Sequence, residues 1–68
     1  MGLSAKMTNE SLEFYRGLID GYQGMILNND EMIKNREISE KKKKGFLLLN
    51  EICKREIKQC QKGIRKLL

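Results

Sequence analysis

Residues 46–68, FLLLNEICKREIKQCQKGIRKLL, decide the fold of this chain. Their apolar side chains recur in steps of three and four, which places them along one stripe of an α-helix. The stripe consists of Phe46, Leu49, Cys53, Ile57, Cys60, Ile64 and Leu67. The rest of the helix surface is rich in lysine and arginine, so one face needs an apolar partner and the opposite face is strongly cationic.

A second stripe with the same spacing lies upstream. It consists of Leu12, Tyr15, Ile19, Tyr22, Ile26 and Ile33, and Asn29 falls in the same series. Leu18, Met25 and Met32 widen the stripe, which is typical of a multi-helix bundle rather than a two-stranded coiled coil. Asn29 has two interpretations: a buried amide that fixes the register of the helices, or part of a turn with Asn28 and Asp30.

The periodic pattern breaks between Lys34 and Gly45, where Ile38 is the single apolar residue. This break predicts a turn near Asn35, with Ser39 as the N-cap of the following helix. We therefore expect an all-α helical hairpin with helices at about 8–34 and 39–67, in which Lys41–Lys44 lie opposite Asp30 and Glu31. Residues 1–7 should fray, and residues 8–68 should form one helical domain.

Two hairpins of this kind would assemble into a four-helix bundle or a coiled-coil oligomer, with the two stripes as core and oligomer interface. A chain of 68 residues buries only about 60% of the surface that its unfolded form exposes, so oligomerisation is a common source of stability at this size. The chain contains no proline, which leaves a single long helix in a coiled coil as an alternative fold.

Three glycines, Gly17, Gly21 and Gly24, stand away from the upstream stripe. Each costs about 1 kcal/mol of helix stability relative to alanine. They indicate either a shallow groove that another helix can approach closely or a locally weak helix.

The two cysteines, Cys53 and Cys60, are expected on one helical face about 10 Å apart, too far for a disulfide between them. Reduced thiols predict a cytoplasmic or nuclear protein, and disulfides between two chains are the alternative. The chain has no histidine, no glycine-rich phosphate loop and no zinc ligand set. We therefore expect no metal site, no cofactor and no catalytic residue, and the protein is not predicted to be an enzyme. No apolar run reaches the roughly 20 residues that a membrane span requires.

Charge is divided unevenly between the two halves of the sequence. Residues 1–40 carry a net charge of −3 and residues 41–68 a net charge of +8. The halves are therefore complementary, and the chain is interpreted as a small basic helical module for oligomerisation and protein–protein interaction. Its expected partners are itself, as a homo-oligomer, and an acidic protein.

The alternative function is a nucleic-acid-binding regulator that contacts the phosphate backbone through its basic second helix. The candidate contacts are Lys41, Lys42, Lys43, Lys44, Lys54, Arg55, Lys58, Lys62, Arg65 and Lys66. No aromatic residue is interleaved with them, so stacking on bases is not expected.

Overall fold

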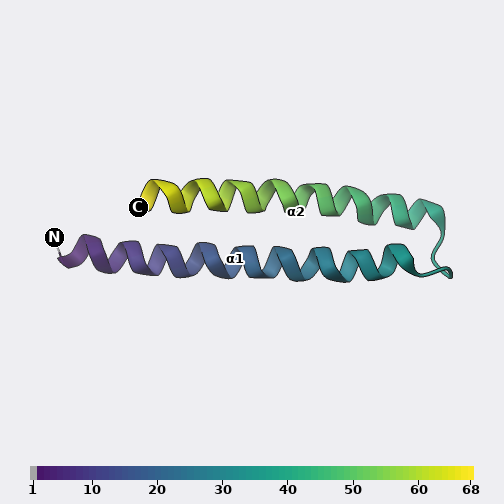
Figure 1. The fold of residues 1–68 in the computed structure, drawn as a ribbon, viewed down its shortest axis with the longest axis horizontal. Coiled ribbons are helices and arrows are strands. Elements are labelled where there is room, and N and C mark those ends of the chain that lie inside the picture. The colour runs from purple at the N-terminus through teal and green to yellow at the C-terminus, as the bar shows by residue number, and fades with distance from the viewer. Residues whose placement is uncertain (1) are drawn as a thin grey trace.

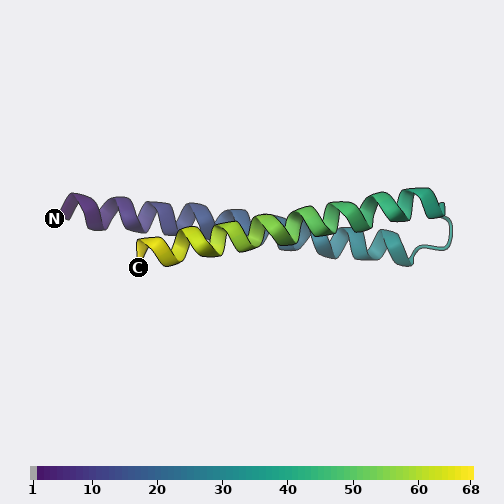
Figure 2. The ribbon, with the colours of Figure 1, turned by 90° about the horizontal axis from the view of Figure 1, so that it is seen from above.

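The protein is a hairpin of two antiparallel helices (Figure 1). The computed structural model describes residues 2–68, and the side chains of residues 9–68. Helix α1 spans Gly2–Lys34 and helix α2 spans Glu40–Leu67, and within residues 2–68 there is no strand. The helices cross at a shallow angle along a rod of 56 × 14 × 11 Å (Figure 2). The predicted hairpin is confirmed, and a single long helix is wrong because the chain reverses direction at residues 35–39.

Helix α1 runs without a break through the asparagine-rich segment at residues 28–30. The interpretation of Asn28, Asn29 and Asp30 as a turn is therefore wrong. The helix also begins at Gly2, earlier than the predicted residue 8, so residues 2–7 lie within its bounds.

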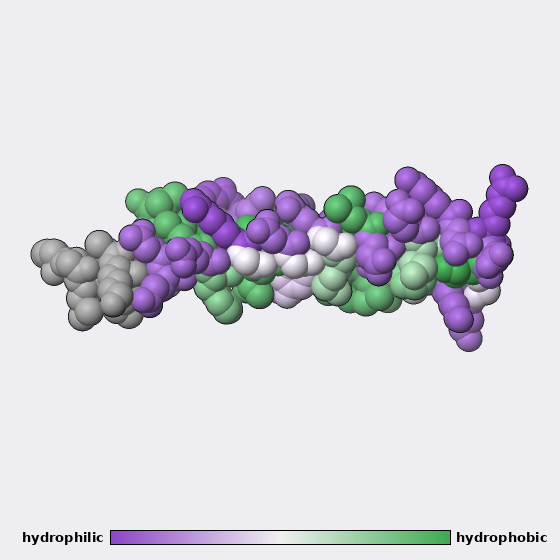
Figure 3. All heavy atoms as spheres, turned by 90° about the horizontal axis from the view of Figure 1, so that it is seen from below, coloured by the Kyte–Doolittle hydropathy of each residue, from purple (hydrophilic) through white to green (hydrophobic). Residues whose placement is uncertain are grey.

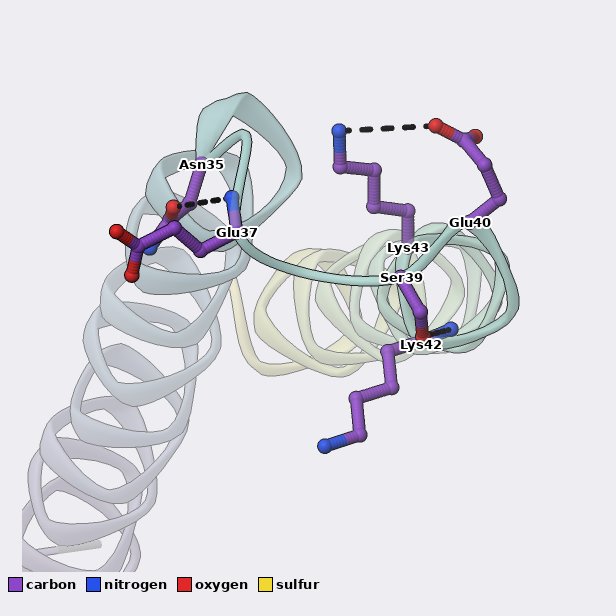
Figure 4. A network of polar contacts seen from close by, with 6 residues as sticks. All are labelled: Asn35, Glu37, Ser39, Glu40, Lys42 and Lys43. Carbon is purple, nitrogen blue, oxygen red and sulfur yellow. Dashed lines mark hydrogen bonds and ion pairs between the residues drawn. The ribbon is translucent and has the colours of Figure 1, made fainter.

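Side chains shape the connection between the helices (Figure 4). The Oδ1 atom of Asn35 accepts a hydrogen bond of 2.9 Å from the backbone N–H of Glu37, which holds the first bend. Ser39 has an extended backbone, with φ −64° and ψ 153°, and its Oγ accepts a bond of 3.3 Å from the N–H of Lys42. Ser39 is thus the N-cap that the sequence predicts, and it satisfies one of the orphan amides at the start of α2.

The four lysines at residues 41–44 lie in the first turns of α2, where the helix dipole disfavours cations. Glu40 precedes them, and its Oε1 atom lies 3.8 Å from the Nζ atom of Lys43. The expectation that these lysines lie opposite Asp30 and Glu31 is wrong, because these two acidic residues lie level with Leu49 and Leu48. The Oδ1 atom of Asp30 instead accepts a hydrogen bond of 3.0 Å from the Nδ2 of Asn50, two turns further along α2.

A polar layer joins the two helices. The Nδ2 of Asn29 donates a hydrogen bond of 2.9 Å to the Oδ1 of Asn50, and these residues are only 6% and 5% exposed. Because the helices are antiparallel, each step forward along α1 from this layer matches a step backward along α2. Residues at the same level are therefore Ile33 and Phe46, Ile26 and Cys53, Tyr22 and Ile57, Ile19 and Cys60, Tyr15 and Ile64, and Leu12 and Leu67.

These residues, with the two asparagines, form the seam between the helices, and all of them are buried or half-buried. The seam differs at one position from the predicted stripe. Asn50 lies in it, whereas Leu49 lies beside it and is 44% exposed. With Asn50 included, the steps of three and four alternate regularly along α2, which keeps the residues facing α1 as the helices wind around each other.

Near the free ends of the helices, the side chain of Tyr15 packs on Gly63. A Cβ atom built on Gly63 would lie 2.6 Å from the Cζ of Tyr15 and 2.8 Å from its hydroxyl oxygen. Real side chains do not approach one another so closely, so a residue larger than glycine displaces the tyrosine ring.

Replacing Asn29 with alanine removes the donor to Asn50 and leaves a buried acceptor unpaired, which should lower the free energy of unfolding by about 1–3 kcal/mol. The double variant Asn29→Leu/Asn50→Leu removes donor and acceptor together and should unfold at a higher urea concentration than either single leucine variant. Urea unfolding at one fixed protein concentration, followed by circular dichroism, measures both effects. A single variant as stable as the parent would show that the polar layer contributes nothing.

Gly63→Ala should destabilise the hairpin by about 1–3 kcal/mol, because the added methyl group overlaps the Tyr15 ring. Gly17→Ala is the matched control, since no heavy atom lies within 4 Å of a Cβ built there. The control should gain up to about 1 kcal/mol from helix propensity. Thermal unfolding of the two variants against the parent tests the contact, and equal shifts in Tm would contradict it.

Candidate interaction surfaces

The seam accounts for most of the residues expected to form the core and oligomer interface. It includes Leu12, Tyr15, Ile19, Tyr22, Ile26, Ile33, Phe46, Cys53, Ile57, Cys60, Ile64 and Leu67, but not Leu49. Within one hairpin these side chains face the chain's own other helix. A second molecule must therefore be contacted mainly through other residues.

The two thiols lie inside the seam. Cys53 and Cys60 are free and buried, on the face of α2 that packs against α1. They form no disulfide with each other, as predicted, and because both are buried a disulfide between two chains would require the hairpin to open first.

The seam forms a thin core. Among residues 9–68, Cys53 and Cys60 are the two fully buried apolar residues, and both are small. Much larger side chains remain open to water, namely Phe14, Met25, Leu27, Met32, Leu47, Leu48, Leu49, Ile52 and Leu68. The hairpin therefore exposes more large apolar side chains than it buries completely.

One side of α1 carries no charge. The positions of the seam residues show which residues lie to either side of them on α1. The uncharged side consists of Ser11, Phe14, Leu18, Gly21, Met25, Asn28 and Met32. The other flank of α1 carries Glu13, Arg16, Asp20 and Asp30. Figure 3 views the molecule from the α1 side: in the middle of the rod, pale and apolar surface lies largely along one edge and hydrophilic surface along the other.

The same side of the hairpin continues across the seam onto α2. In two antiparallel helices, residues with the same place in the seven-residue repeat lie on the same side of the pair. The residues of α2 that lie next to the uncharged residues of α1 are therefore Gly45, Leu49, Ile52, Gln59 and Gly63. Glu56 is the charged residue among them, and Lys42 and Lys66 mark the two ends. We call this surface, on α1 and α2 together, the neutral side.

The glycines of α1 leave open space around the helix. No heavy atom lies within 4 Å of a Cβ built on Gly17, Gly21 or Gly24, and the same holds for Gly45 on α2. Gly21 and Gly45 belong to the neutral side, where the missing side chains make the surface shallow. A hollow of about 260 Å³ lined by Glu10, Ser11, Phe14 and Tyr15 opens near the end of the same surface.

The basic residues lie mainly on the remaining surface of α2. Of the ten candidate phosphate contacts, Lys43 is half-buried and the other nine are exposed: Lys41, Lys42, Lys44, Lys54, Arg55, Lys58, Lys62, Arg65 and Lys66. Among residues 9–68 the ion pairs are Lys43–Glu40 and Lys54–Glu51, both within α2. Among residues 9–68, no acidic side chain of α1 forms an ion pair with this basic surface.

A shallow groove of about 460 Å³ runs along this basic surface. Its lining comprises Ile57, Glu51 and Gln61 together with the cationic residues Lys54, Arg55 and Lys58. Three cations around one groove can approach a single anionic group or successive groups of a polyanion.

No grouping of three or more histidine, cysteine or acidic side chains that could hold a metal ion occurs in the described part of the chain. Neither helix is both long and apolar enough to cross a membrane, within the residues described. No protein-family model, curated protein or solved structure matches this chain.

Sequence reasoning missed Asn50 and Gly63. Hydrophobicity favoured Leu49 over Asn50 because leucine is the more apolar residue. Regular alternation of three- and four-residue steps would have selected Asn50. Gly63 has no signal in its own segment, since its importance depends on a tyrosine far away in the sequence.

Proposed function

We propose that this protein is a small helical module that self-associates and presents a surface to other proteins, without catalytic activity. The observation that carries the proposal is the set of large apolar side chains that the hairpin leaves exposed. Monomeric proteins rarely expose extended apolar surface, and such surface commonly marks contacts between proteins.

The thin core supports the same conclusion. A hairpin whose fully buried apolar residues, among residues 9–68, are two cysteines gains little from burial in isolation. Association with another molecule covers more apolar surface, so folding and assembly would be coupled through concentration.

Sedimentation equilibrium of the full chain at concentrations from about 5 to 200 µM should show a dimer or a larger oligomer that dissociates on dilution, as an interface of modest area implies. Circular dichroism at each concentration should show helical signal falling as the oligomer dissociates. A monomer with full helical signal throughout this range would overturn self-association.

A second candidate function is contact with the phosphate backbone of a nucleic acid. It is favoured by the exposure of the basic residues on α2 and by their freedom from ion pairs with α1 among residues 9–68. Such contacts give salt-dependent affinity with little sequence preference, because each phosphate neutralised releases counterions.

Lys58→Gln tests this second function, because Lys58 lies in the basic groove and outside the seam. If duplex DNA or RNA binds there, the variant should bind more weakly, and the slope of log affinity against log salt should fall by about 0.9 for duplex. Lys34→Gln, at the end of α1, is the matched control and should leave both quantities unchanged. Equal effects of the two variants, or no binding at low salt, would dismiss the basic groove as the contact.

A further inference from the structure

We infer that the neutral side is the surface on which a second copy of this chain docks, so that two hairpins form a four-helix bundle. This inference rests on the proposed function, because it identifies the partner and the contact surface of that self-association.

The distribution of charge along α1 is the first argument. A helix surface that faces water normally carries charged residues, as the flank with Glu13, Arg16 and Asp20 does. From Ser11 to Met32 the neutral side of α1 carries none, while it exposes Phe14, Met25 and Met32. This surface has the composition of a helix face that is covered.

Charge also selects the occupant. A two-fold dimer brings the same patch of two molecules together, so a patch with little charge avoids repulsion between identical charges. An acidic protein or an anionic lipid surface would instead be drawn to the basic residues of α2, most of which lie away from this side. A second hairpin is the partner that a surface with so little charge fits.

The surface is also large enough. From Ser11 to Met32 it extends for about 30 Å at 1.5 Å per residue, and two neighbouring helices make it about 20 Å wide. The contact would cover about 600 Å² on each partner, or about 1,200 Å² in total, at the lower end of stable specific interfaces. The open space at Gly21 and Gly45 allows the second hairpin to approach closely.

This arrangement separates the two candidate surfaces. Lys54, Arg55 and Lys58 lie outside the neutral side, so the basic groove stays open in the dimer. Leu27, Leu47 and Leu48 also lie outside it and remain exposed, available for another protein.

Sedimentation equilibrium of single lysine variants of the full chain tests the inference. Met25→Lys on α1 and Ile52→Lys on α2 place an ammonium group on the neutral side, and both parent residues are exposed in the hairpin. Each variant should dissociate at a concentration about ten-fold or more above that of the parent, because an unpaired charge would be desolvated in the contact. Leu27→Lys and Leu48→Lys, at exposed apolar positions outside the neutral side, are matched controls and should associate as the parent does.

The possible outcomes separate the inference from the proposed function. A parent that associates while the control variants dissociate and the neutral-side variants do not would overturn the inference and leave self-association standing. A parent that stays monomeric would overturn both, and its binding to neutral phosphatidylcholine vesicles would then assign the neutral side to a lipid surface. If a lysine variant loses helical signal at every concentration, Met25→Ala and Ile52→Ala replace it, and parent-like association of both would overturn the inference.

Discussion

The hydrogen bond between Asn29 and Asn50 determines where all other residues of the two helices meet. The apolar layers of the seam are chemically alike, so sliding one helix past the other by seven residues would still pair apolar with apolar. The same slide would separate the two amides and place one of them against Ile57 or Tyr22, at a cost of about 1–3 kcal/mol for an amide left buried and unpaired. Asp30 reinforces the alignment by accepting from the other end of the Asn50 amide. The contact of Tyr15 with Gly63 and the continuity of the neutral side across the two helices follow from this single alignment.

At two of the six apolar layers of the seam, a large residue faces a small one. Ile26 lies level with Cys53 and Ile19 with Cys60, and Tyr15 packs beside Gly63. This pairing lets the helices approach closely, but it limits how much apolar surface one hairpin can bury. The residues that would thicken the core, such as Met25 and Leu49, lie at its margin instead. The two helices are thus held in one alignment around a small core. The stability of such a molecule depends on what covers the apolar side chains at the edge of that core.

The features visible in the sequence were those encoded locally. The hairpin, the turn near Asn35 and the Ser39 cap follow from apolar spacing and from side chains that bond within a few residues. The place of Asn50 in the seam could not be derived in this way, since hydrophobicity favours Leu49 and a polar seam residue is recognisable only with its partner on the other helix. The same holds for Gly63, and for the error over Lys41–Lys44, because the alignment of the helices was unknown. Once Asn29 and Asn50 are known to pair, the neutral side can be found from the sequence. The pairing shows on which side of the seam each residue of the two helices lies.

Placing an acidic helix beside a basic one has a consequence for how the molecule turns in solution. Since no ion pair joins the helices among residues 9–68, their charges remain separated across the short dimension of the rod. The hairpin therefore has an electric dipole moment perpendicular to its long axis. The electric field of a negatively charged partner exerts a torque on this dipole. The torque turns basic helix α2 toward the partner and α1 away from it before any contact forms. The molecule would then approach with its long axis parallel to the partner's surface. Added salt screens the charges and would weaken this torque.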